Sequence, residues 1–554
     1  MDQLTTGAEF LFALVLMLGV LITVHEFGHF AAAKLCGVRV LKFSIGFGPP
    51  IGFGRFRMSW TRGGTEYVIA WLPLGGFVKM LGENPDEVDS PEVEADPGHA
   101  LGSKPTWQKL SVVFAGPAMN LALPVFVFAA TLALGIDRRE AVVGTVEPGS
   151  PAAQAGLLPG DRVVSIQGEP IAWWDELEKQ VRARPREQLT LGVEREGRRS
   201  DLGVEVAKRA GLDVFRLTSE VGWLGLQHDR QMPVVGITSN DTPAARAGLR
   251  SGDRVARVGE TPVEDWTAFA QAYAQSQGPV ELTLIRGAEG SEIRLSVPSL
   301  GGVAELGVIP AVVLVASVSE GKPAARAGIG PGDLIVAVDD APLGSFSTFQ
   351  ETVLASEGRT LAILVAREGE TRRVSIRPEL TQVGEGGVEG ELYLIGIRGE
   401  DATLPGAIAT DQVLNPLVAL PRAAAMTVDL TRIFMSGLQK VISGEISRRS
   451  IGGPIEIAKQ SHMALQAGWD RFVNLLVLIS INLGILNLLP IPILDGGQAL
   501  MFLVEEVKRS PLSIRTRELV QQLGLVVLVA LMGFAFWNDV SRHWSSFLEW
   551  VKGL

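Results

Sequence analysis

The stretch VHEFGHF, Val24 to Phe30, places two histidines and a glutamate at the end of a long apolar run. His25 and His29 are four residues apart, so on a helix both imidazoles project from one face and can hold one metal ion. Zinc fits such a site because it accepts imidazole and carboxylate ligands, does no redox chemistry and makes a bound water more acidic. Glu26 stands where its carboxylate can act as base toward that water and later as acid toward a leaving amine. These residues predict one Zn2+ ion and a hydrolytic reaction.

The apolar neighbours of this motif argue against a chance occurrence. An ionisable side chain near the middle of a bilayer costs about 2.5–3.5 kcal/mol on insertion scales, so such residues are kept where they bind or react. The alternative interpretation is a polar cluster that joins neighbouring helices by hydrogen bonds.

A catalytic zinc site normally has three protein ligands and one open position, so two histidines do not complete it. One known pattern places a third histidine six residues after the second, but this chain has Leu35 there. The other histidines lie in loops or outward regions: His99, His228, His462 and His543. The third ligand is therefore expected in another apolar segment.

The run INLGILNLLPIPILDGGQAL, residues 481–500, contains Asp495 as its only carboxylate. It belongs to an apolar segment that, as one helix, would be about 50 Å long against a hydrocarbon core of about 30 Å. Pro490 and Pro492 remove amide donors, so residues 490–497 are expected to be extended or turned. Irregular backbone at membrane depth is tolerated only where protein or a wet cavity satisfies it. We predict Asp495, at this break, as the third zinc ligand.

Two asparagines precede the break. Asn482 and Asn487 are polar residues in an otherwise apolar run. They can hold a substrate backbone or stabilise an oxyanion, and the alternative role is hydrogen bonding between helices.

Four apolar segments are long enough to cross a bilayer. They cover residues 8–33, 110–135, 472–504 and 518–537. The first lacks a basic leader and a small-residue cleavage site, so we expect a permanent span rather than a removed signal peptide. The chain is therefore expected to be a multi-pass α-helical membrane protein in contact with the lipid bilayer.

Basic residues gather in two of the connecting segments, which predicts that these segments are cytoplasmic. They are Lys34, Arg39, Lys42, Arg55, Arg57, Arg62, Lys79, Lys104 and Lys109 in the first segment, and Lys508, Arg509, Arg515 and Arg517 in the second. Both termini and the long segment between the second and third spans are then expected outside, with the HEFGH motif toward the cytoplasmic side.

The bulk composition excludes several classes of protein. Among 554 residues, 47% are hydrophobic and the net charge is −11, with no basic cluster that would favour nucleic-acid binding. Cys36 is the only cysteine, so an intramolecular disulfide and a cysteine-rich zinc module are both impossible. We interpret Cys36 as a small apolar helix residue.

The outward segment contains three repeats that align without a gap. They are GSPAAQAGLLPGDRVVSI (149–166), DTPAARAGLRSGDRVARV (241–258) and GKPAARAGIGPGDLIVAV (321–338). Each predicts a short helix with proline in its first turn and glycine after it, then a Gly-Asp turn and a strand. Ser150 and Thr242 can cap the first two helices, whereas Lys322 is a weaker cap.

The repeats resemble bacterial PDZ domains, which are α+β modules that bind extended peptides by strand addition. Their glycine-containing loop is matched by LGL (224–226), LGV (306–308) and IGI (395–397). Each loop follows its repeat, which favours the circularly permuted arrangement, in which the strand after the loop closes the domain. Alternatively, some of the three domains only pack or block access.

Two further segments have readable patterns. Residues 38–80 alternate and turn at Gly-Pro and Gly-Gly, which predicts a β-hairpin or small sheet next to the first span. Residues 422–450 place apolar side chains on one helical face, so we expect an amphipathic helix that lies on the membrane or packs on the third repeat. GEGGVEGE, residues 384–391, is interpreted as a flexible loop.

Three motifs together resemble the site-2 protease family of intramembrane zinc metalloproteases. They are HEFGH in the first span, AGPAMN (115–120) in the second and NLLPIPILDGG (487–497) in the third. The inserted repeats and GGPIEIAK (452–459) are most similar to the regulator of sigma-E protease branch. The resemblance implies zinc ligation by His25, His29 and Asp495, catalysis by Glu26, substrate handling by Asn482 and Asn487, and a membrane-dipping hairpin at residues 38–80.

The resemblance also implies partners and a location. The expected substrates are single-span membrane proteins such as anti-sigma factors, cut after an upstream site-1-type protease has trimmed them, and possible further substrates are remnant signal peptides. The expected location is the bacterial inner membrane, with the PDZ domains and both termini periplasmic. This chain departs from the family in having three repeats rather than two, and Gln498 where histidine is common.

These patterns predict nine segments along the chain: a first span with HExxH (1–36), a hairpin region (37–107), a second span (108–136), three PDZ domains (137–228, 229–310 and 311–400), an amphipathic linker (401–469), a third span with LDGG (470–506) and a fourth span with a tail (507–554). The leading hypothesis is an intramembrane zinc endopeptidase whose PDZ domains gate access.

Two alternatives remain from other classes. The first is a membrane-anchored PDZ adaptor with an inactive metal site, against which the intact set of four site residues argues. The second is an aspartyl intramembrane protease, but the Gly-Asp pairs of this chain all lie in the repeats.

Overall fold

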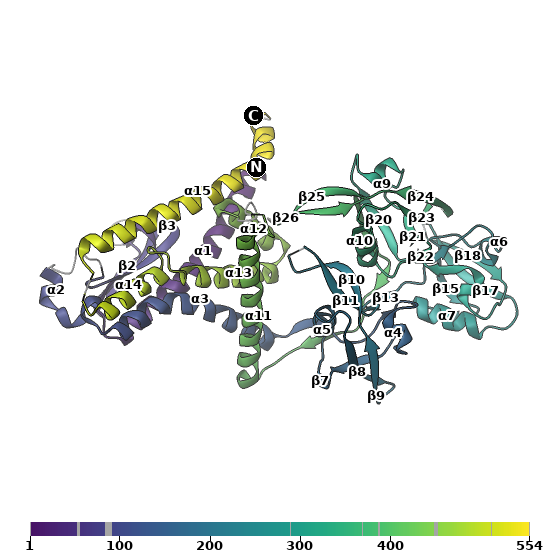
Figure 1. The fold of residues 1–554 in the computed structure, drawn as a ribbon, viewed down its shortest axis with the longest axis horizontal. Helices are drawn as coiled ribbons and strands as arrows, with labels where there is room; N and C mark the ends of the chain where they lie inside the picture. Colours follow the sequence, from purple (N-terminus) through teal and green to yellow (C-terminus); the bar gives the residue numbers. More distant parts are fainter. Residues whose placement is uncertain are drawn as a thin grey trace. The chain divides into compact units, whose positions relative to one another are not determined.

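The computed structural model describes residues 2–52, 56–83, 91–215, 217–287, 290–367, 369–385, 388–447, 452–510 and 512–552. The chain forms two compact units. The first, called the membrane unit, consists of Met1–Gly135 and Gln412–Leu554, and the second, called the repeat unit, consists of Ile136–Asp411. The repeat unit is thus an insertion between two parts of the membrane unit (Figure 1).

The membrane unit contains long apolar helices. Its helices are α1 (Asp2–Leu35), α2 (Pro91–Ala95), α3 (Thr106–Leu134), α11 (Pro416–Ser443), α12 (Pro454–Ala467), α13 (Trp469–Asn487), α14 (Asp495–Lys508) and α15 (Ile514–Lys552), with 3-10 turns at Pro97–His99 and Leu101–Ser103. Within the described residues, four stretches are long and apolar enough to span a membrane: Glu9–Leu35, Thr106–Leu134, Trp469–Asn487 and Ile514–Ser541.

The third apolar segment is shorter as a span than its sequence suggests. Helix α13 ends at Asn487 and α14 begins at Asp495, so the LDGG motif opens a separate helix instead of belonging to one span over 470–506. The irregular backbone covers residues 488–494, not 490–497. The prolines end α13 early, whereas the residues from Asp495 onward have amide donors and resume a helix.

The three strands found between residues 40 and 80 form an antiparallel sheet rather than a simple hairpin. Its strands are β1 (Val40–Pro50), β2 (Ser59–Arg62) and β3 (Thr65–Met80), in the order β1-β3-β2. The long β3 pairs with β1 twice, because Phe43 faces both Tyr67 and Val78. The final segment of β3, Gly76–Met80, therefore returns along the other edge of β1.

Helix α11 covers 416–443 and packs inside the membrane unit. Ala423 is fully buried against Phe128 of α3 and against Val477 and Ile481 of α13, and Met426 and Leu430 extend this contact. The amphipathic face therefore contacts two apolar helices of the same unit. The two surfaces expected from the sequence, the membrane and the third repeat, did not include this neighbour, which becomes adjacent only in three dimensions.

Helix α12 begins at the GGPIEIAK segment and is held by the last long helix. The fully buried carboxylate of Asp539 in α15 accepts hydrogen bonds from the amides of Gly453, Ile455 and Glu456. These amides are donors that a helix start leaves without an internal partner. A side chain at 453 would meet Asp539 and the α15 backbone, so glycine is required there.

The repeat unit consists of three similar modules, with β4 (Ile136–Arg139) paired to β29 (Ile408–Asp411) at its entry and exit. Module 1 contains β5 (Thr145–Val146), α4 (Pro151–Gln154), β6 (Arg162–Ile166), β7 (Glu169–Pro170), α5 (Trp174–Arg182), β8 (Gln188–Arg195), β9 (Arg198–Glu205), β10 (Ala207–Leu212), β11 (Thr218–Trp223) and β12 (Leu226–Gln227). Module 2 contains β13 (Arg230–Gln231), β14 (Val235–Ile237), α6 (Pro243–Arg246), β15 (Arg254–Val258), β16 (Thr261–Pro262), α7 (Trp266–Gln275), β17 (Val280–Arg286), β18 (Ser291–Val297), α8 (Val303–Leu306) and β19 (Val308–Pro310). Module 3 contains β20 (Val313–Val318), α9 (Pro323–Arg326), β21 (Leu334–Val338), β22 (Ala341–Pro342), α10 (Phe346–Ala355), β23 (Leu361–Arg367), β24 (Glu370–Ile376), β25 (Glu379–Glu385), β26 (Val388–Leu394), β27 (Ile397–Asp401) and β28 (Thr403–Leu404).

Each module has its own hydrophobic core and the same closure. The strand after each glycine loop pairs antiparallel with the strand before the repeat: β12 with β5, β19 with β14 and β27 with β20. In each module the closing strand is therefore C-terminal, as expected for the permuted arrangement. Residues 384–391 differ from the expectation of a loop, because β25 and β26 pair there as a hairpin and only 386–387 fall outside the described residues.

The repeated Gly-Asp turn has a structural reason. Asp161, Asp253 and Asp333 are each almost fully buried and ion-paired with Arg195, Arg286 and Arg367 at 2.6, 2.6 and 2.5 Å. Each carboxylate also accepts an amide of its own turn. Because each aspartate is buried and ion-paired inside its own module, the three are not available as a catalytic pair.

Candidate metal centre

Three side chains predicted as metal ligands converge in the membrane unit. His25 and His29 lie on α1 and are both less than a tenth exposed, and Asp495 is the first residue of α14. Nε2 of His25 lies 3.2 Å from Asp495 Oδ2, and Nε2 of His29 lies 3.5 Å from Asp495 Oδ1. The two Nε2 atoms are 3.2 Å apart. The structure thus brings together the three side chains expected from the sequence, although His25 and Asp495 are 470 positions apart.

The separations fit a tetrahedral zinc ion. With zinc–ligand bonds of about 2.0–2.1 Å, the ligand atoms of a tetrahedron are about 3.3–3.4 Å apart. The three observed distances of 3.2, 3.2 and 3.5 Å match this edge. Two imidazoles and one carboxylate leave a fourth position open, which is the arrangement of a catalytic rather than a structural zinc site.

Each histidine has an outer hydrogen-bond partner on α3. Nδ1 of His29 lies 2.8 Å from the carbonyl oxygen of Val112, so its proton sits on Nδ1 and Nε2 remains free to bind a metal. Nδ1 of His25 lies 3.1 Å from the side-chain amide of the fully buried Asn120. Asn120 belongs to AGPAMN but was given no role from the sequence, because its contact joins residues 95 apart.

Glycines allow α1, α3 and α13 to approach closely. A Cβ at Gly116 would lie 2.3 Å from Nε2 of His29, and a Cβ at Gly28 would lie 2.3 Å from the carbonyl oxygen of Ala115. A Cβ at Gly484 would crowd Leu121 and the carbonyl of Pro117. Small residues are the usual means of helix contact within membranes, and their presence in AGPAMN was the sequence signal for this packing.

The LDGG motif places Asp495 by backbone packing. The turn at 488–491 lies directly on the start of α14: a Cβ at Gly496 would be 2.3 Å from the carbonyl oxygen of Leu488, and a Cβ at Gly497 would be 2.2 Å from that of Ile491. Only glycine permits this approach. The paired glycines therefore fix where α14 begins and hold its first carboxylate beside the histidines.

Glu26 lines a cavity of about 190 Å3 together with the three predicted ligand residues. The other lining residues are Phe77, Val78, Met80, Glu83, Val113 and Gln498. The segment Gly76–Met80 forms one wall, and the Glu26 side chain lies against Gly76 and faces the amide of Val78. Glu26 is thus in the same cavity as the ligands, where a base can reach a water held between them.

The two asparagines on α13 are not among the residues that line this cavity. Asn482 is half-buried, and its Oδ1 has no hydrogen-bond partner within the described part of the chain. Asn487 is the last residue of α13.

Comparison with known proteins places the chain among proteases. The family model described as peptidase family M50 matches residues 13–531. The regulator of sigma-E protease RseP of Salmonella typhimurium is 32% identical over 533 residues, which cover 96% of this chain and 98% of that protein. A protein of Neisseria meningitidis that is named as a zinc metalloprotease is 29% identical and covers 97% of this chain and 99% of its own length. The solved PDZ domain of an SdrC-like protein from Listeria monocytogenes is 15% identical, covers 16% of this chain and 87% of that domain, and has a TM-score of 0.13.

Proposed function

The chain belongs to peptidase family M50, the site-2 protease family, and on this premise we propose that it hydrolyses a peptide bond within or next to a transmembrane segment of its substrate. It is a zinc metalloendopeptidase of the site-2 type. The observation that carries the proposal is the convergence of His25, His29 and Asp495 at zinc-ligand distances, with Glu26 in the same cavity and apolar helices around it.

The proposed chemistry assigns a task to each polar group. When bound, zinc supplies a Lewis acid for the scissile carbonyl and a water acidic enough to lose a proton near neutral pH. Glu26 accepts that proton and later delivers it to the leaving nitrogen. His25, His29 and Asp495 would hold the zinc ion. Asn482 and Asn487, in the last two turns of α13, are proposed to bind the substrate backbone.

A helical substrate must unwind before its peptide bond reaches Glu26, and the sheet offers a template for the extended form. The segment Gly76–Met80 pairs with β1 on one edge and lines the cavity on the other. In the part of the chain that the structure describes, no further strand pairs with that other edge. We propose that the substrate adds to it as a strand, which presents its backbone to the metal centre.

The same sheet and the segment between β1 and β2 carry exposed apolar side chains that suit a membrane surface. They are Phe47, Phe56, Met58, Trp60, Trp71 and Leu72, each more than two-fifths exposed. Aromatic residues favour the membrane interface, so we propose that the sheet is membrane-associated. The protein is placed in the bacterial inner membrane, with the repeat unit and both termini proposed to be periplasmic and the metal centre toward the cytoplasm.

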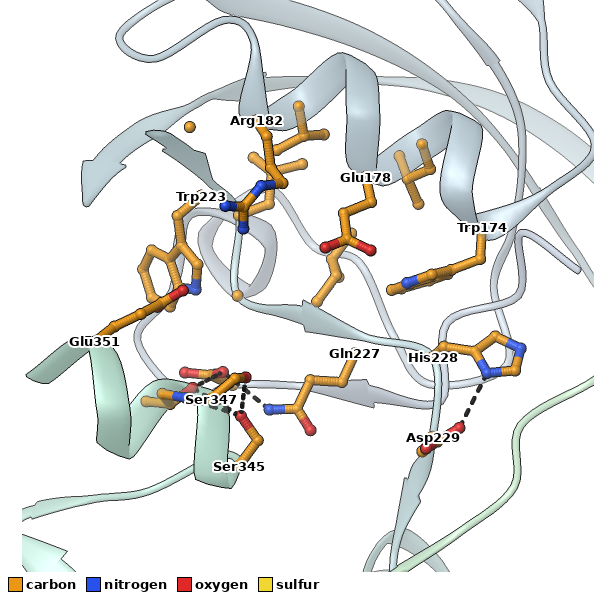
Figure 2. A pocket seen from close by; sticks show the side chains of 18 of the residues that line it. Trp174, Glu178, Arg182, Trp223, Gln227, His228, Asp229, Ser345, Ser347 and Glu351 are labelled. Carbon is orange, nitrogen blue, oxygen red and sulfur yellow. Dashed lines mark hydrogen bonds and ion pairs between the residues drawn. The ribbon is translucent and has the colours of Figure 1, made fainter. Parts of the chain in front are cut away.

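We propose that the three modules of the repeat unit are PDZ domains that gate access to the metal centre. In module 1 the peptide groove of a PDZ domain corresponds to the space between β12 and α5. A cavity of about 260 Å3 lies there, and it is lined by Trp174 and Glu178 of α5, by Gln227 of β12, and also by Ser347 and Glu351 of α10 in module 3. Figure 2 shows α5 and α10 on opposite sides of this groove.

Specific contacts hold module 3 over the groove of module 1. Arg209 of β10 pairs with Glu351 at 3.0 Å, with each side chain about a fifth exposed. Oε1 of Glu147 accepts hydrogen bonds from Gln227 and from Thr348 of α10. Burial raises the pKa of Glu351, and Arg209 opposes this rise. The third module thus restricts the first, which supports a gate that excludes bulky outer domains.

The gate predicts a change in substrate selection when this ion pair is removed. Arg209→Gln and Glu351→Gln each leave a partly buried charge without its partner, which loosens the contact between the modules. We expect the cleavage rate of a substrate that retains its folded outer domain, relative to the trimmed substrate, to rise about tenfold. The charge-swapped protein Arg209→Glu/Glu351→Arg should restore the wild-type ratio. An unchanged ratio in both single variants contradicts the gate.

The proposed function is tested by cleavage in a membrane. Purified protein is reconstituted into liposomes with a trimmed single-span anti-sigma factor, and mass spectrometry of the products locates the cut. We expect a cut inside or next to the apolar segment, abolished by a zinc chelator and restored by added zinc. A soluble peptide without the apolar segment serves as the control. Cleavage that survives complete zinc removal, or that falls only in the outer domain, is incompatible with the proposal.

A further inference from the structure

Asn120 stands behind His25 and is only partly satisfied. It lies on α3 with none of its surface exposed, and its Nδ2 is 3.1 Å from Nδ1 of His25. Its Oδ1 is buried and has no hydrogen-bond partner among the described residues. A buried amide oxygen without a partner is unfavourable, so this end of the side chain calls for an explanation.

Whether the amide nitrogen or the amide oxygen of Asn120 faces His25 depends on which imidazole nitrogen carries the proton. Nε2 of His25 lies 3.2 Å from Asp495 Oδ2, and in the tautomer that donates from Nε2 to this carboxylate, Nδ1 accepts from Asn120. When Nε2 binds a metal, the proton must instead sit on Nδ1, and Nδ1 then needs an acceptor. A half-turn of the Asn120 amide brings Oδ1 to the position of Nδ2 and supplies this acceptor.

We propose that Asn120 is a positioning residue that holds His25 in its metal-binding tautomer. An amide is suited to the task because it donates to one tautomer and accepts from the other. His29 obtains the same support from the backbone carbonyl of Val112, which no side-chain substitution removes. His25 is therefore the histidine whose orientation depends on a replaceable group. The inference rests on the proposed zinc function.

Two substitutions of similar size separate hydrogen bonding from packing. Asn120→Leu fills the site without a hydrogen bond, whereas Asn120→Asp keeps an acceptor for Nδ1 of His25. The full-length proteins are purified in detergent, and their zinc content and the rate of zinc loss to a chelator are measured. We expect Asn120→Leu to bind zinc about 10- to 100-fold more weakly and Asn120→Asp to retain it as the wild type does.

The control lies on a different contact of the same residue, the one that joins α3 to α13. Ser480 donates to the backbone carbonyl of Asn120 at 2.7 Å, so Ser480→Ala disturbs the helix contact but leaves the amide in place. We expect it to retain zinc. The visible spectrum of cobalt-loaded protein should change for Asn120→Leu and not for Ser480→Ala, because only the first alters a ligand histidine.

The outcomes distinguish this inference from the proposed function. Wild-type zinc retention by Asn120→Leu, or a loss by Asn120→Asp as large as that by Asn120→Leu, overturns the positioning role. If a packing defect were responsible, leucine would be the better tolerated residue of the two. A wild-type protein that binds zinc but cleaves no membrane substrate would refute the proposed function and leave the zinc measurements on Asn120 valid.

Discussion

Glu26→Gln is expected to lower the rate of peptide hydrolysis by about 10²- to 10⁴-fold, the range that general acid–base catalysis contributes. Gln keeps the size and the polarity of the side chain but cannot accept and return a proton at neutral pH. Glu26 shares its cavity with the ligand residues and is not one of the three grouped ligands. The substitution should therefore remove catalysis and leave zinc content unchanged.

The cavity contains a matched comparison for this experiment. Glu83 is a second carboxylate in its lining, but its Oε2 accepts the amide of Met80 at 3.1 Å and so supports the local chain. We expect a much smaller loss of activity for Glu83→Gln. The rates are measured on the liposome substrate together with zinc content. Equal cleavage by wild type and Glu26→Gln would contradict the proposed mechanism, whereas no cleavage by the zinc-loaded wild type would favour the adaptor hypothesis.

The grouping of the three predicted ligands was predictable, because the free-energy cost of such residues in an apolar run is visible in the sequence. Ionisable residues are expensive in an apolar run, so His25, His29 and Asp495 were conspicuous without any knowledge of their distance in space. The prolines before Asp495 likewise predicted a broken helix. Its boundaries shifted by a few residues because Gly496 and Gly497 retain their amides and join α14 instead of extending the turn.

The residues that sequence reasoning missed act across helices. Asn120 and Gly116 belong to the AGPAMN motif, but the motif alone did not show their contacts, which depend on α1 lying against α3. Helical periodicity shows which face of a helix is apolar but not which neighbour covers it. The same limit applies to α11, whose apolar face packs on α3 and α13. The contact between Arg209 and Glu351 was equally hidden, because nothing in a repeat indicates which face meets another repeat.

Asp495→Ala is expected to release zinc and abolish activity together, unlike Glu26→Gln. Its two carboxylate oxygens lie 3.2 and 3.5 Å from the two imidazoles, so the substitution removes one of three protein ligands. The loss of affinity should exceed the about 10- to 100-fold that removal of an outer hydrogen-bond partner costs. Zinc content and chelator kinetics measure it, and added zinc should restore little activity.

A second aspartate separates loss of the metal from loss of the fold. Asp539 is fully buried in the same unit, but its carboxylate holds the start of α12 and lies outside the metal centre. We expect Asp539→Ala to lower the unfolding temperature in detergent, because three amides lose their acceptor, and yet to retain zinc in the folded protein. We expect Asp495→Ala to lose zinc without a lower unfolding temperature. The substitution removes a ligand carboxylate, and with it a charge that is unfavourable among apolar helices. If Asp495→Ala keeps its zinc, the broken third segment does not supply the ligand, and the two histidines must be completed by another group.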